Sequence, residues 1–149
     1  MKKIETCIVI ANGTKARLYF NDGPGHGLKA RPDLDMARKE QHARDIQSDK
    51  PGRSFESQGG ARHAIEYASD PQRVAERRFL GDIIARLREL EHDSAFDRLV
   101  LVASPKVLGD MRRLLPRSLG AKIYVDVNKD LTHLSDHDLV QHLKDVIVL

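Results

Sequence analysis

The stretch FDRLVLVASPKVLGDMRRLL, residues 96–115, decides the fold class of this chain. Residues 99–103 are a continuous apolar run, which is typical of a strand whose two faces are both buried. Ser104 and Pro105 then supply a side-chain cap and a favoured first residue for a helix. A buried strand followed directly by a helix is typical of α/β sheets, so this stretch predicts a mixed sheet covered by helices.

Two further elements follow this pattern toward the end of the chain. Ile123, Val125 and Val127 alternate with polar residues, which predicts a half-buried strand. Ser135 and Asp138 have the spacing of a capping box and predict the start of a last helix. The later strands are therefore expected to be joined by helical crossovers.

The strongest helix signal lies upstream, over residues 70–91. Asp70 is a suitable N-cap, and Pro71 is favoured as the first helical residue. Arginines occupy many of the polar positions of this segment. Apolar residues recur every three or four positions and predict the buried side: Val74, Leu80, Ile83, Ile84, Leu87 and Leu90.

The N-terminal part of the chain predicts a β-hairpin. Residues 4–10 and 16–20 are two apolar runs, and Asn12-Gly13 lies between them. Asn-Gly is the strongest short-range hairpin signal, because both residues tolerate the positive φ of a type I′ turn.

A polar region separates the hairpin from the long helix. We expect a third strand over residues 28–34, a short helix over residues 35–46 and an exposed loop over residues 47–60. The chain, residues 1–149, is therefore predicted to be a single α/β domain. Its mixed sheet is flanked by helices, and a long exposed loop precedes the first long helix.

Composition restricts the class of protein further. The chain has 25 Lys+Arg against 22 Asp+Glu, and this net charge of +3 is by itself weak evidence for a nucleic-acid partner. No apolar run approaches the roughly 18–20 residues of a membrane helix, so we expect no membrane insertion. The single cysteine, Cys7, lies in an apolar strand, where a thiol is usually inert packing. Without a signal peptide or a disulfide framework, the expected location is the cytoplasm.

Glycines and arginines of the polar loop and of the long helix form a candidate binding site for RNA or a partner. Two adjacent glycines let the backbone adopt unusual φ values and expose its amides to a phosphate. A mobile connector is the alternative, and the residues alone leave the two open. The candidate contact residues are Arg53, Ser57, Gln58, Gly59, Gly60, Arg62, His63, Arg73, Arg77 and Arg78.

No sequence pattern indicates a catalytic or metal centre. The chain has no HExxH motif, no paired Cys/His ligand spacing and no G-x-S-x-G nucleophile elbow. His133 and His137 are four residues apart, but the predicted helix start at Ser135 lies between them. We therefore expect no metal, no cofactor and no catalytic residue.

Four segments occur in an order that resembles a known family. They are IVIANGTKARLYF (8–20), SQGGARHAIEY (57–67), FDRLVLVASPKVLGDMRRLL (96–115) and VNKDLTHLSDHDLVQHL (127–143). Together they resemble the bacterial host-attachment protein family, small proteins described as required for attachment to host cells. The resemblance covers nearly the whole chain.

That family is similar in turn to the middle domain of archaeal and eukaryotic class-1 peptide release factors. The long loop of that α/β domain carries Gly-Gly-Gln into the peptidyl-transferase centre of the ribosome. Gly59 and Gly60 match the paired glycines, and Arg62 lies in the basic stretch after them. The glutamine does not match, because Ala61 follows the pair and Gln58 precedes it. Ala61 has no polar group with which to orient a water, so the resemblance implies the fold and the partner but not the hydrolysis.

Three functions are open at the level of the sequence. The first is a cytoplasmic, non-enzymatic module that binds structured RNA or the ribosome, mainly through phosphates. The second is a hydrolase acting on peptidyl-tRNA or RNA through Gln58, His63 and Glu66. The third is an oligomeric protein-interaction factor in attachment to host cells. The sequence defines neither the oligomeric state nor any protein partner.

Overall fold

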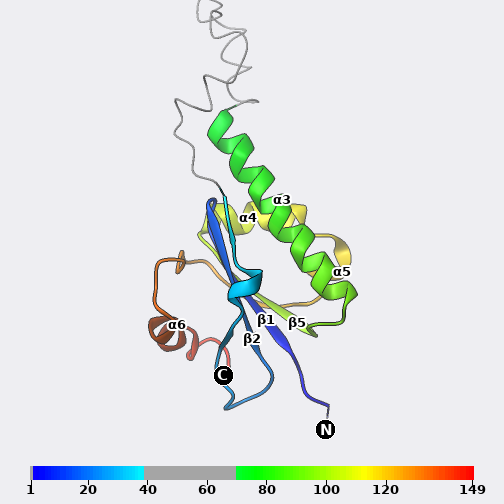
Figure 1. Ribbon diagram of the computed structural model, residues 1–149, viewed down its shortest axis with the longest axis vertical. Helices are drawn as coiled ribbons and strands as arrows, with labels where there is room; N and C mark the ends of the chain where they lie inside the picture. Colours follow the sequence, from blue (N-terminus) through cyan, green and yellow to red (C-terminus); the bar gives the residue numbers. More distant parts are fainter. Residues whose placement is uncertain (1, 39–69) are drawn as a thin grey trace, which may run out of the picture.

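A six-stranded mixed sheet with helices on both faces forms the core of the protein (Figure 1). The computed structural model describes residues 2–38 and 70–149. The strands follow the order β3-β2-β1-β5-β6, and β4 also pairs with β2. This arrangement confirms the predicted α/β fold. The strands are β1 (Thr6–Ala11), β2 (Lys15–Asn21), β3 (Lys29–Ala30), β4 (Met36–Ala37), β5 (Arg98–Val102) and β6 (Ile123–Val127). The helices are η1 (Pro32–Leu34), α3 (Pro71–His92), α4 (Pro105–Leu114), α5 (Arg117–Gly120) and α6 (Asp136–Leu143).

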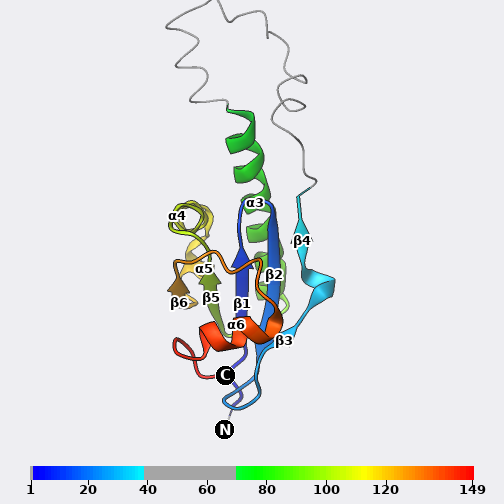
Figure 2. The same cartoon turned by 90° about the vertical axis from the view of Figure 1, so that its left-hand side faces the viewer.

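The sheet separates two apolar cores. Strands β1, β5 and β6 run parallel, and β2 returns antiparallel beside β1. Figure 2 shows α6 in front of the sheet and α3 behind it. One core packs the sheet against α3, α4 and α5, and the other packs it against α6. Residues 99–102 of β5 are buried and divide between the two cores, as their unbroken apolar run predicts.

The N-terminal hairpin is confirmed, but the predicted type I′ turn is wrong. In the described residues, positive φ occurs only at Gly23, Gly25, Gly27 and Ser94, and therefore not at Asn12 or Gly13. The side-chain oxygen of Asn12 instead accepts hydrogen bonds from the backbone N–H groups of Thr14 (2.8 Å) and Lys15 (2.9 Å). The side chain of Asn12 thus closes the turn, which removes the need for positive φ.

The segment after the hairpin differs from the sequence expectations. The predicted third strand is only the two-residue β3, and η1 follows it. The predicted helix from Asp35 is wrong where the structure describes it, since β4 pairs with β2 there. Asp35 accepts the backbone N–H of Leu18 (2.9 Å) and so binds β2 instead of capping a helix. The rest of that predicted helix and the predicted loop, residues 39–60, lie outside the described residues.

The three predicted helix starts are confirmed. Asp70 accepts the N–H of Gln72 at the start of α3 (3.0 Å). Ser104 and Ser135 cap α4 and α6 in the same way. The prediction that Val74 lies on the buried side of α3 is wrong, because this residue is 38% exposed. Both ribbon views show the first turns of α3 projecting past the edge of the sheet, so the sheet does not cover this position (Figures 1 and 2).

The strict alternation predicted for β6 is also wrong. Ile123 packs on the core beneath α3, whereas Val125 and Val127 pack on the core beneath α6. The register between β5 and β6 shifts between Leu99 and Val100, and this irregularity moves the later residues to the other face.

No helix that the structure describes combines the length and the apolar composition needed to cross a bilayer.

Candidate functional site

Three of the ten candidate contact residues lie in the described part of the chain. Arg73, Arg77 and Arg78 belong to the first turns of α3, and all three are exposed. The other seven lie outside the described residues: Arg53, Ser57, Gln58, Gly59, Gly60, Arg62 and His63. The described part of the site therefore consists of α3 and its neighbours.

Helical geometry brings Arg73 and Arg77 together and separates Arg78 from them. Residues four apart are neighbours on a helix surface, so Arg73 and Arg77 share one side of α3. Arg78 is turned by about 100° from Arg77 and lies on a different side.

Glu91 shows what that shared side of α3 faces. It follows Arg73 by 18 residues, and at 3.6 residues a turn this is about five full turns. The Glu91 carboxylate accepts a hydrogen bond from Ser118 on α5 (3.0 Å) and pairs with Lys122 (3.2 Å). On the opposite side, Arg86 donates to the carbonyl of Leu34 in η1 (3.2 Å). Arg73 and Arg77 therefore lie on the side of α3 that faces α4 and α5.

The helices that pack against α3 carry further exposed arginines, and the sequence patterns did not predict them. Arg88 precedes Glu91 by three residues, so it shares that side of α3. The adjoining helices carry exposed Arg113 on α4 and exposed Arg117 on α5. We call the set Arg73, Arg77, Arg88, Arg113 and Arg117 the arginine face. Its α3 members share a helical spacing that is readable in the sequence, but their neighbours depend on tertiary packing.

Two carboxylates near the arginine face are bound by other groups, whereas Glu89 and Asp93 line the same hollow as Arg88. Glu91 is held by Ser118 and Lys122, as above. Asp110 is buried and pairs with Arg113 at 2.7 Å. Asp82 and Glu89 lie about half a turn away from Arg73 around the α3 axis. Positive charge therefore predominates on the side of α3 that faces α4 and α5.

The positive end of the α3 dipole adds to this charge. Helices usually carry Asp or Glu in their first turn, where the unpaired N–H groups amount to a partial positive charge. The first turn of α3 has no acidic residue and carries Arg73, although the carboxylate of the N-cap Asp70 lies at this helix end and accepts the N–H of Gln72. An anion at this position would interact favourably with both the dipole and the guanidinium groups.

The turn between β1 and β2 packs beside the first turns of α3. A Cβ atom on Gly13 would lie only 2.7 Å from the Cγ of Glu76. Arg38 contacts the same turn from the other side, because its N–H donates to Thr14 (2.7 Å) and its Nε to Gly13 (3.1 Å). Arg38 and α3, which precede and follow residues 39–69, are therefore both fixed to one turn of the sheet.

A family comparison agrees with the resemblance seen in the sequence. The model of the family described as "Protein required for attachment to host cells" matches residues 7–143. The chain belongs to this family. The match extends from β1 to the last residue of α6 and so includes the arginine face. A comparison with curated proteins finds no match.

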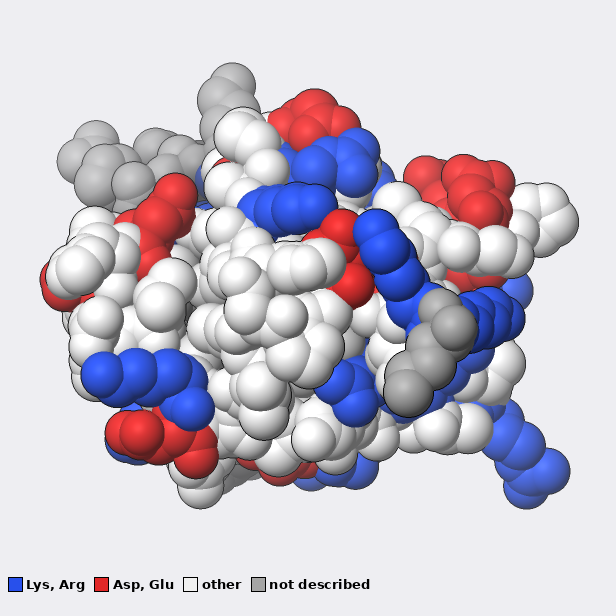
Figure 3. All heavy atoms as spheres, turned by 90° about the horizontal axis from the view of Figure 1, so that it is seen from below, with Lys and Arg blue, Asp and Glu red and all other residues white. Residues whose placement is uncertain are grey.

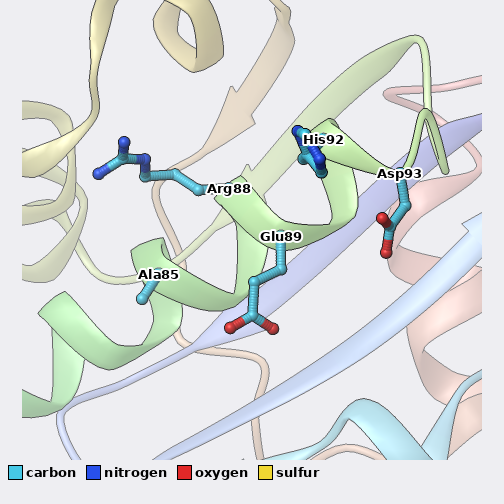
Figure 4. A pocket seen from close by; sticks show the side chains of 5 residues that line it. All are labelled: Ala85, Arg88, Glu89, His92 and Asp93. Carbon is cyan, nitrogen blue, oxygen red and sulfur yellow. The ribbon is translucent and has the colours of Figure 1, made fainter.

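A shallow hollow lies on the surface of α3 toward its C-terminal end. Figure 4 shows the residues that line it, Ala85, Arg88, Glu89, His92 and Asp93. The guanidinium of Arg88 points away from the carboxylates of Glu89 and Asp93. In residues 2–38 and 70–149, no group of three or more His, Cys, Asp or Glu is arranged to hold a metal ion.

Cys7 fills the core, as the sequence predicts. Its side chain is fully buried on β1, and burial raises the pKa of its thiol to about 12. A thiol in this state is neutral near neutral pH and is inaccessible to reagents, so Cys7 is no nucleophile.

The end of the molecule that carries the chain termini has mixed charge. Figure 3 views this end and shows acidic and basic side chains interspersed around an uncharged area. Asp22, for example, binds both His26 (2.7 Å) and Lys29 (2.9 Å). Hydrogen bonds from Lys29 and then His26 lower the pKa of Asp22 to about 2. Such local pairing contrasts with the predominance of arginine beside α3.

Proposed function

We propose that this protein is a non-catalytic module that binds structured RNA through the arginines of α3. One observation carries the proposal. Arg73 and Arg77 lie exposed on one side of α3, at the end of the helix where the dipole is already positive.

The placement of Arg73 opposes the α3 dipole, and the N-cap carboxylate of Asp70 lessens this conflict. A positive side chain in the first turn of a helix opposes the dipole, and comparable charge placements change stability by about 0.3–1 kcal/mol. Departures from such local rules are expected at functional sites, where another requirement outweighs stability. A phosphate bound beside Arg73 lessens the conflict further, because its negative charge adds to that of the Asp70 carboxylate at the helix end.

Arginine suits this ligand chemically. Its planar guanidinium presents a fork of N–H donors that matches phosphate oxygens in pairs. Contacts of this kind fix the position of the protein on a nucleic-acid backbone but do not read its sequence. The proposed module therefore recognises the phosphates of folded RNA and not a defined base sequence.

The proposal includes the ribosome as the source of the RNA and the cytoplasm as the location. Two features support it: the order of strands and helices is compatible with the release-factor middle domain, and Gly59-Gly60 matches the paired glycines of that domain. Ala61, in place of glutamine, favours binding without hydrolysis. The residues of the hydrolase alternative, Gln58, His63 and Glu66, lie outside the described residues.

Binding across a salt series tests the proposal. The full chain is titrated into a fluorescently labelled folded ribosomal RNA fragment, and the logarithm of the affinity is plotted against the logarithm of the salt concentration. We expect a steep fall, and we expect Arg73→Gln with Arg77→Gln to reduce the slope by roughly 1 for each phosphate that the variant no longer binds. Lys2→Gln with Lys144→Gln is the matched control, because it removes the same charge from exposed positions away from α3. Absence of binding at low salt, or equal effects of the two double variants, contradicts the proposal.

A further inference from the structure

We infer that the RNA bound at the arginine face is double-helical, so that Arg73, Arg77, Arg88, Arg113 and Arg117 contact the phosphates of a duplex and not unpaired bases. The inference rests on the proposed function and specifies the kind of RNA that it requires.

The rigidity of the α3 arginines favours a rigid partner. From Arg73 to Arg88 the helix rises by about 22 Å at 1.5 Å per residue. Between these positions α3 is fixed to the sheet by five buried side chains, Phe79, Leu80, Ile83, Ile84 and Leu87. A duplex presents its phosphates in a fixed array, whereas a flexible single strand loses conformational entropy when it is held along such a row.

The adjoining helices widen the row into a surface. Helices α4 and α5 pack against α3 and carry Arg113 and Arg117. Arg113 is oriented by Asp110, which is buried beneath it and accepts its Nη1 hydrogen bond at 2.7 Å. Because these guanidinium groups come from three helices, they can reach phosphates beside the row as well as along it. This spread suits the two backbones of a duplex better than one extended strand.

The same helices carry no exposed Phe, Tyr or Trp on which unpaired bases could stack. Proteins usually hold single-stranded nucleic acid by stacking its bases on exposed aromatic side chains. Across α3, α4 and α5 the aromatic residues are Phe79, which is only 4% exposed, and His92, which is exposed at the C-terminal end of α3. Tyr124 is 47% exposed, but it belongs to β6, and the guanidinium of Arg98 lies 3.9 Å from its ring centre.

Duplex RNA makes no demand for such stacking. Its major groove is too deep and narrow for side chains to read, so proteins recognise it mostly by shape and by phosphate and 2′-hydroxyl contacts. A surface of exposed guanidinium groups without exposed Phe, Tyr or Trp rings meets this requirement. The expected binding is therefore independent of base sequence and strongly dependent on salt.

A comparison of two RNA probes tests the inference. The full chain is titrated into an RNA hairpin of roughly 16–20 base pairs and into an unstructured oligouridylate with the same number of phosphates, both at one salt concentration. We expect the hairpin to bind about tenfold tighter or more, with little change when its base sequence is altered. Equal binding of oligouridylate overturns the duplex inference but leaves phosphate binding through the arginines of α3 standing, whereas tighter binding of oligouridylate also contradicts the proposed preference for structured RNA. Absence of binding to both probes overturns the two together.

Single variants then locate the binding surface. Arg88→Gln and Arg117→Gln are expected to weaken hairpin binding and to reduce the salt slope by roughly 1 each. Arg78→Gln is the matched control on α3, because this arginine is exposed but turned away from the face. Thermal unfolding checks that each variant is folded. If Arg78→Gln weakens hairpin binding as much as Arg88→Gln, the proposed surface is wrong.

Discussion

The guanidinium of Arg17 on β2 lies 2.7 Å from the carboxylate of Asp136 in the first turn of α6. The same guanidinium donates to the backbone carbonyls of Thr132 and Leu134 in the preceding loop. The hydroxyl of Tyr19, two residues along β2, donates to the same Asp136 oxygen at 2.5 Å. These bonds fix α6 and its loop to the sheet across more than 110 positions of sequence, in addition to the apolar core beneath α6.

Replacement of Arg17 should destabilise the protein markedly. Arg17→Leu leaves two carbonyls without their donor and the Asp136 carboxylate with the Tyr19 hydroxyl alone, and we expect a loss of about 1–3 kcal/mol in the free energy of unfolding. Urea denaturation measures this change. Arg112→Leu is the control, because it removes an arginine whose pair with Asp126 is largely exposed. Its cost should stay below about 1 kcal/mol, and equal costs for the two variants would contradict the role given to Arg17.

Stability should fall at alkaline pH in part because of Tyr19. Burial raises the pKa of its hydroxyl above the ordinary value of 10.0, and the hydrogen bond to Asp136 raises it further. Above about pH 10 the unfolded chain loses this proton while the folded protein keeps it, so the free energy of unfolding decreases with rising pH. Tyr19→Phe should flatten this part of the profile in urea titrations at successive pH values. The raised pKa of the Cys7 thiol also makes the free energy of unfolding decrease at alkaline pH, so Tyr19→Phe should keep part of the pH dependence.

The contact between Gly13 and Glu76 should limit which residues the hairpin turn accepts. A Cβ on Gly13 would meet Glu76, so Gly13→Ala forces that side chain out of its rotamer at a cost of roughly 1 kcal/mol. The cost should largely vanish in the background of Glu76→Ala, which a double-mutant cycle with thermal unfolding measures. An unchanged cost in that background would show that space beside Glu76 is not the reason for the glycine.

Gly81 provides the opposite case in the same helix. A Cβ at this position meets no atom within 4 Å, and the residue lies in the interior of α3. Gly81→Ala should therefore stabilise the protein by about 0.5–1 kcal/mol, because alanine loses less conformational entropy in a helix. A decrease in melting temperature would contradict this.

Local signals in the sequence predicted the elements that local chemistry determines. The caps Asp70, Ser104 and Ser135 each bind a backbone N–H two or three residues away, so the helix starts could be read directly. The conformation of the turn at Asn12 could not be read in this way, because the Asn12 side chain also donates a hydrogen bond to Thr132, 120 residues away. The prediction of a helix from Asp35 was wrong for a similar reason. Strand β4 forms there because pairing with β2 prevails over the helical tendency of the sequence.

The residues of the candidate site likewise include some that the sequence predicted and others that depend on long-range packing. Arg73 and Arg77 were found because they belong to the start of the helix that follows the glycine loop in the sequence, whereas Arg88, Arg113 and Arg117 were missed. Helical spacing places Arg88 on the side of Arg73, but only the contact of Glu91 with Ser118 shows that this side faces α5. Such a neighbourhood depends on how helices pack, and one sequence does not contain that information.

Arg73 should show opposite effects on stability and on binding. It lies in the first turn of α3, where a positive charge opposes the helix dipole, so Arg73→Gln should raise the free energy of unfolding by about 0.3–1 kcal/mol at low ionic strength. The same change removes a guanidinium that binds phosphate and should weaken RNA binding. Thermal unfolding and RNA titration at matched salt measure the two effects.

Arg88→Gln separates this effect from a general loss of charge. Arg88 lies near the C-terminal end of α3, where the dipole favours positive charge, so its removal should weaken RNA binding without any gain in stability. The gain from Arg73→Gln should also shrink at high salt, because exposed charges are then screened. If both variants stabilise the protein equally, relief of general repulsion explains the gain and the dipole does not. If Arg73→Gln stabilises the protein but leaves RNA affinity unchanged, the unfavourable charge in the first turn of α3 serves another ligand.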